Sequence, residues 1–280
     1  EKDSAFYYHK FKEYLENVKE AFAETPGWQQ RKLVLTIDEF TSAYKWMKKG
    51  LITEQFMQRW KSLRSDNLFC AVLVGQDVLH SFLRDAGMAN YMAIFKWKRL
   101  TYLQPHDARR LITETMLEAT GGHDIFLDKA VDQILFYSAS SAFYTKWICY
   151  KLTEYLNTHK LSKVSKADVE AAVREAINSD PNEVNTIFDP LLYSGVDPIE
   201  SEYTKEQTSE ILNQVAEAEL DDPQTGCHKS RINSSDKNVV VKNLLDNLDS
   251  RDVLVKNGDY YSLNVKLYLR WTQKNKFGNV

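Results

Sequence analysis

Two adjacent carboxylates, Asp38 and Glu39, offer the clearest chemistry in the sequence. They follow the apolar run 33–37, LVLTI, which is typical of a buried strand in a parallel sheet. Such a strand would deliver both carboxylates to the carboxyl edge of the sheet, where ligands bind. There Asp38 would hold Mg²⁺, directly or through water, and Glu39 would orient and polarise an attacking water.

The same pair has a simpler interpretation, in which it only starts a helix. Asp38 would then be the N-cap, and Glu39 would be a first-turn residue that favours the positive end of the helix. The neighbouring sequence bears on the choice between the two. A second apolar run, 69–74, ends in Gly75-Gln76, so polar residues follow both predicted strands.

The composition is that of a folded domain in a reducing compartment. Of 280 residues, 43% are hydrophobic and 27% charged, with a net charge of −3, so no global attraction to nucleic acid or anionic membranes is expected. The three cysteines are scattered, which argues against a disulfide framework and favours a cytoplasmic location. No apolar run is long enough to cross a bilayer, and we expect no membrane partner.

The elements that must position the carboxylates alternate between helix and strand. Periodicity predicts helices over 3–24, 53–63 and 77–83, and strands over 33–37, 68–74 and 99–103. This alternation predicts an α/β sheet.

After Pro105 the pattern becomes helical. We expect helices over 105–119, 127–137, 143–157 and 166–178. Pro105 suits the first turn of its helix, and Ser165 with Asp168 forms a capping-box variant. Residues 181–202 are predicted to be a connection with one short helix over 188–193.

The C-terminal part has the element order of a winged helix. Helices are predicted over 203–220, 239–248 and 265–274, with a mobile polar loop over 222–236. Asn257-Gly258 predicts a hairpin between the last two of these helices.

As an ordered set, these segments resemble the STAND branch of P-loop NTPases, close to AAA+ and origin-recognition ATPases. Residues 36–40, TIDEF, resemble a Walker B motif, and the stretches 56–63, 72–77, 99–103 and 107–112 follow it as in that family. Residues 144–157 resemble the lid helix over the nucleotide, and 244–248, 260–263 and 269–271 resemble the closing winged helix. The resemblance implies an α/β partial P-loop NTPase core (1–104), an all-α helical lid (105–180) and a winged-helix domain (181–280).

The resemblance also implies roles for individual residues. Asp38 would hold the Mg²⁺ of bound ATP, and Glu39 would be catalytic. Gln76 would be the catalytic sensor near the γ-phosphate, although it also fits an ordinary loop residue. Arg99 would join Asp38 in binding the cofactor. Arg59, Arg64 and Arg99 lie in plausible places for an arginine finger, but none can be assigned to that role from sequence, and each also fits a plain surface charge.

Two departures from the family pattern bear on activity. The chain has no G-x-x-x-x-G-K-[ST] loop, so the phosphate-binding loop is either upstream or lost. The opening residues, which lack an initiator methionine, favour a truncated start and hence a chain that is inactive alone. Ser141-Ala142-Phe143 stands where family lids often carry Gly-x-Pro, which leaves adenine contact there open.

These features predict part of an ATP-dependent signalling switch, in which Mg²⁺-ATP controls the lid and winged helix. Its expected partners are ATP and either a second copy or an effector. One alternative is a DNA-binding module, but the expected recognition helix sets Lys237 and Lys242 against Asp246 and Asp249, which does not favour nucleic acid. The other alternative is a non-enzymatic scaffold with a dead nucleotide site.

Overall fold

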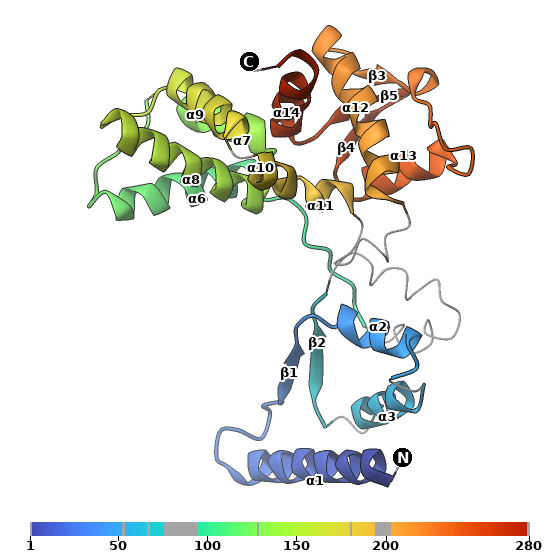
Figure 1. Cartoon of the computed structure of the whole chain (residues 1–280). Helices are drawn as coiled ribbons and strands as arrows, with labels where there is room; N and C mark the ends of the chain where they lie inside the picture. The colour runs from blue at the N-terminus through green and yellow to red at the C-terminus, as the bar shows by residue number, and fades with distance from the viewer. Residues whose placement is uncertain are drawn as a thin grey trace. The chain divides into compact units, whose positions relative to one another are not determined.

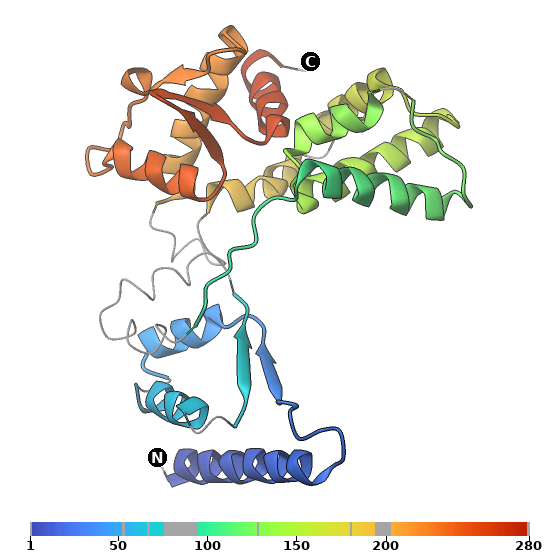
Figure 2. The same cartoon turned by 180° about the vertical axis from the view of Figure 1, so that it is seen from behind.

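The computed structural model describes residues 2–51, 54–65, 68–75, 95–127, 129–179, 181–193 and 203–278. The chain divides into two compact units, Glu1–Lys98 and Arg99–Val280. Figures 1 and 2 show a small sheet with helices in the first unit, and helices with a second sheet in the other. Each unit is built around its own hydrophobic core.

The N-terminal unit places helices against one face of a parallel strand pair. Its described elements are α1 (Lys2–Glu24), β1 (Val34–Ile37), α2 (Thr41–Lys48), α3 (Glu54–Ser65) and β2 (Cys70–Leu73). Leu15 of α1 and Trp60 and Leu63 of α3 are buried together with Leu68 and Phe69. Leu35 and Ile37 of β1 pack against this cluster, so α1 and α3 cover one face of the sheet.

The prediction that both strands are buried on each face is wrong for the described residues. Exposure alternates along β1 and β2, and Val34 and Val72 remain 56% and 45% exposed. A parallel strand is buried on both faces only when elements cover both sides of its sheet. Here the core cluster covers the side of Leu35, Ile37 and Leu73.

The predicted third strand over 99–103 is also wrong. Residues 99–104 form no strand, and Leu100 is 86% exposed. The Leu103 amide donates to the carbonyl of Ser140 at 3.0 Å, so this segment is hydrogen-bonded to the turn that joins two helices and not to a sheet. Tyr102 packs against the core of the C-terminal unit.

Four helices follow, with bounds close to those predicted. They are α6 (Pro105–Ala119), α7 (Ala130–Ser138), α8 (Ala142–His159) and α9 (Lys166–Asn178). Pro105 occupies the first turn of α6, where its missing N–H has no helical partner to lose. The predicted capping box is confirmed, because the Ser165 side chain and the Asp168 side chain each accept from the other's backbone amide.

The connection after α9 is more ordered than predicted. It contains α10 (Pro181–Ile187), which the sequence analysis missed, and α11 (Asp189–Leu192), which matches the expected short helix. Val184 and Ile187 on α10 are buried in the same core as the preceding helices. Burial of these side chains stabilises a helix too short to form alone.

The C-terminal elements enclose a three-stranded antiparallel sheet. They are α12 (Lys205–Asp221), β3 (Cys227–His228), the 3₁₀ turn η2 (Lys229–Arg231), α13 (Val241–Ser250), β4 (Leu254–Asn257), β5 (Tyr260–Leu263) and α14 (Lys266–Phe277). The strand order is β3-β5-β4. The predicted hairpin is confirmed: β4 and β5 pair, and Gly258 has a φ of +61° at the turn.

The segment 222–236, predicted to be a mobile polar loop, contains short regular elements and is hydrogen-bonded to α12. This segment contains β3 and η2, and Cys227 is buried. The Gln214 side chain of α12 bonds both the amide and the carbonyl of Asn233, at 2.9 and 2.7 Å. Gly226 has a φ of +72°, and a Cβ there would lie 2.6 Å from the Tyr261 carbonyl oxygen, so only glycine fits.

One hydrophobic core runs through the whole C-terminal unit. It extends from Ile112 on α6 to Tyr268 on α14, and its member Phe188 is fully buried. The stretches 105–180 and 181–280, which the sequence analysis treats as two domains, therefore share a core. Within this core Glu219 accepts from the Leu263 amide at 2.9 Å and pairs with Lys266, which satisfies its buried carboxylate.

Candidate functional site

Asp38 and Glu39 lie where β1 ends, at the carboxyl edge of the parallel strand pair. The last residues that pair in the two strands are Ile37 and Leu73, and backbone hydrogen bonds continue just past this pair. The Val74 amide donates to the Ile37 carbonyl at 2.8 Å, and the Phe40 amide donates to the Val74 carbonyl at 2.8 Å. The two carboxylates are thus fixed beside the end of β2, as predicted for the backbone.

The geometry does not support the helix-cap interpretation of this pair. Helix α2 begins at Thr41 and has no acidic residue in its first turn. The Asp38 carboxylate instead accepts from the Glu39 amide at 2.8 Å. Among the described residues it has no other hydrogen bond or ion pair, and the side chain is exposed. Asp38 can therefore offer carboxylate oxygens to a ligand.

Glu39 has an unusual backbone conformation. Its φ of +52° lies in the left-handed region, which non-glycine residues adopt at a cost. The neighbours hold it there, because the Ser42 amide donates to the Glu39 carbonyl at 2.8 Å and both Phe40 and Thr41 are buried. Such conformations cluster at functional sites. The result is an exposed pair of carboxylates on a firmly anchored turn.

These two carboxylates fit a Mg²⁺ site only in part. Mg²⁺ is commonly held by one or two carboxylates, with water and phosphate oxygens completing an octahedron. Within the described part of the chain, no group of three or more His, Cys, Asp or Glu side chains could hold a metal ion. A metal at Asp38 would therefore need oxygen ligands from water and a phosphate.

The described structure does not test the other two predicted site residues, Gln76 and Arg99. Gln76 lies outside the described residues, which stop at the exposed Gly75 before it. Arg99 belongs to the C-terminal unit, where its guanidinium donates to the Ser250 carbonyl and pairs with Asp252 at 3.3 Å. The roles of Gln76 and Arg99 as nucleotide ligands stay predictions.

The largest pKa shifts in the C-terminal unit have a structural cause. Burial raises the pKa of Cys149 and of Tyr268 to about 12, and it raises the pKa of Tyr144 well above its usual range. The Tyr144 hydroxyl donates to the Ile187 carbonyl at 3.0 Å, and the Tyr268 hydroxyl donates to Asn213 at 3.0 Å. Shifted pKa values can mark active sites, but Tyr144 and Tyr268 are buried core side chains whose hydroxyls already have hydrogen-bond partners.

A second group of charged residues, not predicted from the sequence, lies in the C-terminal unit. Arg174 on α9 and Arg270 and Lys274 on α14 line a common pocket. Arg270 and Lys274 are four residues apart, so the sequence alone could have predicted that they share one face of a helix. Their meeting with Arg174 was not predictable, because α9 and α14 lie far apart in the chain.

Comparisons with known proteins found no similar protein or family. No family model matches the sequence, and neither a curated protein nor a solved structure matches it. Among the described helices, none is both long and apolar enough to cross a membrane.

Proposed function

We propose that this chain is part of an ATP-dependent regulatory switch of the STAND-like P-loop NTPase type. The observation that carries the proposal is the placement of Asp38 and Glu39. Both are exposed at the carboxyl end of β1 in a parallel strand pair, and neither begins the following helix. Exposed carboxylates at this edge suit the binding of a metal-complexed phosphate.

The two carboxylates have different roles in this proposal. Asp38, oriented by the Glu39 amide, would hold Mg²⁺ directly or through water. Bound Mg²⁺ would neutralise charge on the phosphate oxygens of ATP. Glu39 would accept a hydrogen bond from the attacking water and orient it. Because the sequence has no phosphate-binding loop motif, the remaining phosphate contacts would come from a segment outside this chain.

The C-terminal unit would be the moving part of the switch. Helices α6 to α9 would form the lid, and the order α12, β3, η2, α13, β4, β5, α14 with a β3-β5-β4 sheet supports a winged helix after it. Because both parts share one core, a change of state would carry them together. An effector or a second copy of the chain would read that change.

No observation favours the DNA-binding alternative. Tyr261 forms a hydrogen bond that raises the pKa of Lys256 on the hairpin, and the nearby Asp246 adds to the effect. Lys229 is paired with Asp259 at 2.8 Å. A surface of paired and mixed charges is poorly suited to a phosphate backbone, which needs clustered cations.

Substitution of the two carboxylates tests the proposal in a protein that joins this chain to a phosphate-binding loop. Glu39→Gln should retain ATP binding and slow hydrolysis about 10²–10⁴-fold, because the amide is nearly isosteric but cannot polarise water as a carboxylate does. Asp38→Ala should instead weaken Mg²⁺-dependent ATP binding. Glu20→Gln, at an exposed site on α1, is the matched control and should change neither property.

Hydrolysis assays and nucleotide titrations separate the outcomes. If both site variants hydrolyse ATP normally and differ only in melting temperature, the carboxylates have a structural role alone. The isolated chain should show negligible turnover, since phosphate positioning supplies most of the catalysis. Robust turnover by the isolated chain that Asp38→Ala abolishes would show that the phosphate contacts lie within it.

A further inference from the structure

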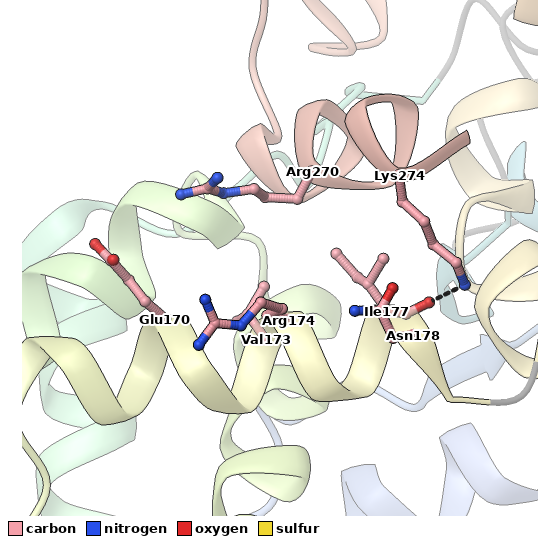
Figure 3. Close-up of a pocket in the computed structure, with 7 residues that line it drawn as sticks. All are labelled: Glu170, Val173, Arg174, Ile177, Asn178, Arg270 and Lys274. Carbon is pink, nitrogen blue, oxygen red and sulfur yellow. Dashed lines mark hydrogen bonds between the residues drawn. The ribbon is translucent and has the colours of Figure 1, made fainter. Parts of the chain in front are cut away.

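A cavity of about 60 Å³ opens between α9 and α14 in the C-terminal unit (Figure 3). Its floor is apolar, formed by the buried side chains of Val173 and Ile177. Figure 3 shows Arg174 rising from α9 on one side, with Arg270 reaching across from α14 above it. Two guanidinium groups from different helices thus face the same small space.

Arg270 is held in place by uncharged groups. Its Nε donates to the hydroxyl of buried Tyr137 at 3.1 Å, and its Nη1 donates to Gln273 Oε1 at 3.1 Å. Within the described part of the chain, Arg270 forms no ion pair with a carboxylate. Its Cζ also lies 5.9 Å from the centre of the Tyr137 ring, so neutral partners orient the side chain and, among the described residues, its charge has no carboxylate partner.

The other lining charges leave the cavity positive. Arg174 has no hydrogen bond or ion pair among the described residues. Lys274 donates to the Ile177 carbonyl at 2.5 Å, so its ammonium meets the C-terminal end of α9 without a carboxylate. Glu170 is the one acidic residue of the lining, and its carboxylate lies 3.7 Å from Lys166, one turn earlier on α9.

We propose that this cavity binds a phosphate group, with Arg174 and Arg270 as its ligands. Guanidinium groups bind phosphate oxygens through paired N–H donors, and they are less strongly hydrated than ammonium groups. The cavity has room for several water-sized spheres, which suits one tetrahedral oxyanion but not a nucleoside. The phosphate is either free or the terminal group of a nucleotide whose remainder stays outside.

Binding at this place would join two parts of the C-terminal unit. One ligand residue lies on the helical bundle and the other on the last helix after the small sheet. A phosphate between them would hold α14 against α9 and raise the stability of the unit by mass action. This proposal does not depend on Asp38 and Glu39, which belong to the other unit.

A titration of the full chain with sodium phosphate, at constant ionic strength, tests the proposal by calorimetry and melting temperature. Wild type should bind phosphate and melt at a higher temperature in its presence. Arg174→Gln and Arg270→Gln should each weaken binding at least about tenfold, because each removes a charge-assisted hydrogen bond. Arg231→Gln, at an exposed arginine on η2, is the matched control and should bind as wild type does.

Removal of the one acidic lining residue gives a test of opposite sign. Glu170→Gln should tighten phosphate binding, since it removes a repulsive charge from the cavity. Glu175→Gln, also on α9 but paired with His159 at 3.4 Å outside the cavity, should leave the affinity unchanged. An effect of net charge alone would make these two variants alike and would overturn the proposal.

The source of the phosphate is identified by repeating the titration with ATP in the absence of metal. Competition between ATP and inorganic phosphate, with the same dependence on Arg174, would identify a nucleotide phosphate. Binding of inorganic phosphate alone would identify a free oxyanion. The proposal fails if neither binds, or if Arg174→Gln binds phosphate as tightly as wild type. Arg174 is exposed and unpaired, so this variant stays informative even if Arg270→Gln does not fold.

Discussion

The two units of this chain differ in the size of the buried cluster that their described residues form near the candidate site residues. The N-terminal unit carries Asp38 and Glu39 on a strand pair packed against a small cluster around Trp60 and Phe69. The C-terminal unit surrounds Phe188 with a core that runs through helices and sheet alike. Among the described residues, the carboxylates thus lie beside the smaller buried cluster, whereas the arginine-lined cavity lies in the unit with the larger one.

This difference bears on where the chain can open locally. Local stability follows the number of buried apolar contacts, so thinly packed regions open at lower free energy. A site that needs a ligand to complete it can occupy such a region, because binding adds the missing stability. A site that joins two packed helices needs a scaffold that is already ordered.

The largest loss of stability is expected from the substitution Phe188→Ala. Phe188 is fully buried, and its ring centroid lies 5.1 Å from that of Tyr268 and 5.4 Å from that of Trp271. Truncation of a buried phenylalanine leaves a cavity and costs about 3–5 kcal/mol. Segment-resolved hydrogen exchange should show lost protection across the C-terminal unit and unchanged protection in α1, because the two core clusters share no residue.

Phe143→Ala is the matched control for this substitution. Phe143 lies in the first turn of α8 and is 50% exposed, so its truncation should cost far less. If Phe188→Ala also removed protection from α1, the two units would unfold together. That result would contradict the view that their cores are independent.

A smaller loss of stability than that of Phe188→Ala is expected at alkaline pH. Burial, with a smaller contribution from Asp252, raises the pKa of Tyr102 to about 12, and burial raises that of Tyr268 to about 12. Between pH 10 and 12 only the unfolded chain would lose these protons, so the folded state binds more protons and its stability falls as pH rises. Each tyrosine contributes a loss of about 1.4 kcal/mol per pH unit within that window.

Urea denaturation at several pH values measures this slope. Cys149, whose pKa burial also raises to about 12, should add to it from about its usual value of 9.0 upward. Tyr102→Phe should flatten the fall in stability above pH 10 while leaving neutral-pH stability much less affected. An unchanged slope in Tyr102→Phe would contradict the assignment of this effect to its buried hydroxyl.

The features predicted correctly from sequence are those decided by a few neighbouring residues. Gly258 supplies the positive φ that the hairpin turn needs, and the Ser165–Asp168 box fixes the start of α9. The end of β1 before Asp38 was visible for the same reason. In each case the side chain or the missing Cβ acts on backbone only a few residues away.

The features predicted wrongly depend on distant partners. The sequence of β1 does not reveal that Leu35 faces a cluster while Val34 faces outward, because that depends on what covers the sheet. The two-residue strand at Cys227 exists only because Tyr261 pairs with it. The left-handed Glu39 and the meeting of Arg174 with Arg270 likewise depend on contacts made across the folded chain.

The smallest change in stability is expected for a substitution on the exposed face of the N-terminal sheet. The same substitution in the C-terminal core gives the comparison. Val72→Thr keeps the shape of a side chain that is 45% exposed, so it should change the free energy of unfolding by no more than about 0.5 kcal/mol. The same substitution at Val215, which is fully buried on α12, places a hydroxyl in an apolar core and should cost about 1–3 kcal/mol. Segment-resolved hydrogen exchange reports both variants in their own units, so each is compared with wild type at the same segment. Similar costs at the two positions would mean that Val72 is covered in solution, and the sheet would then have to be packed on both faces.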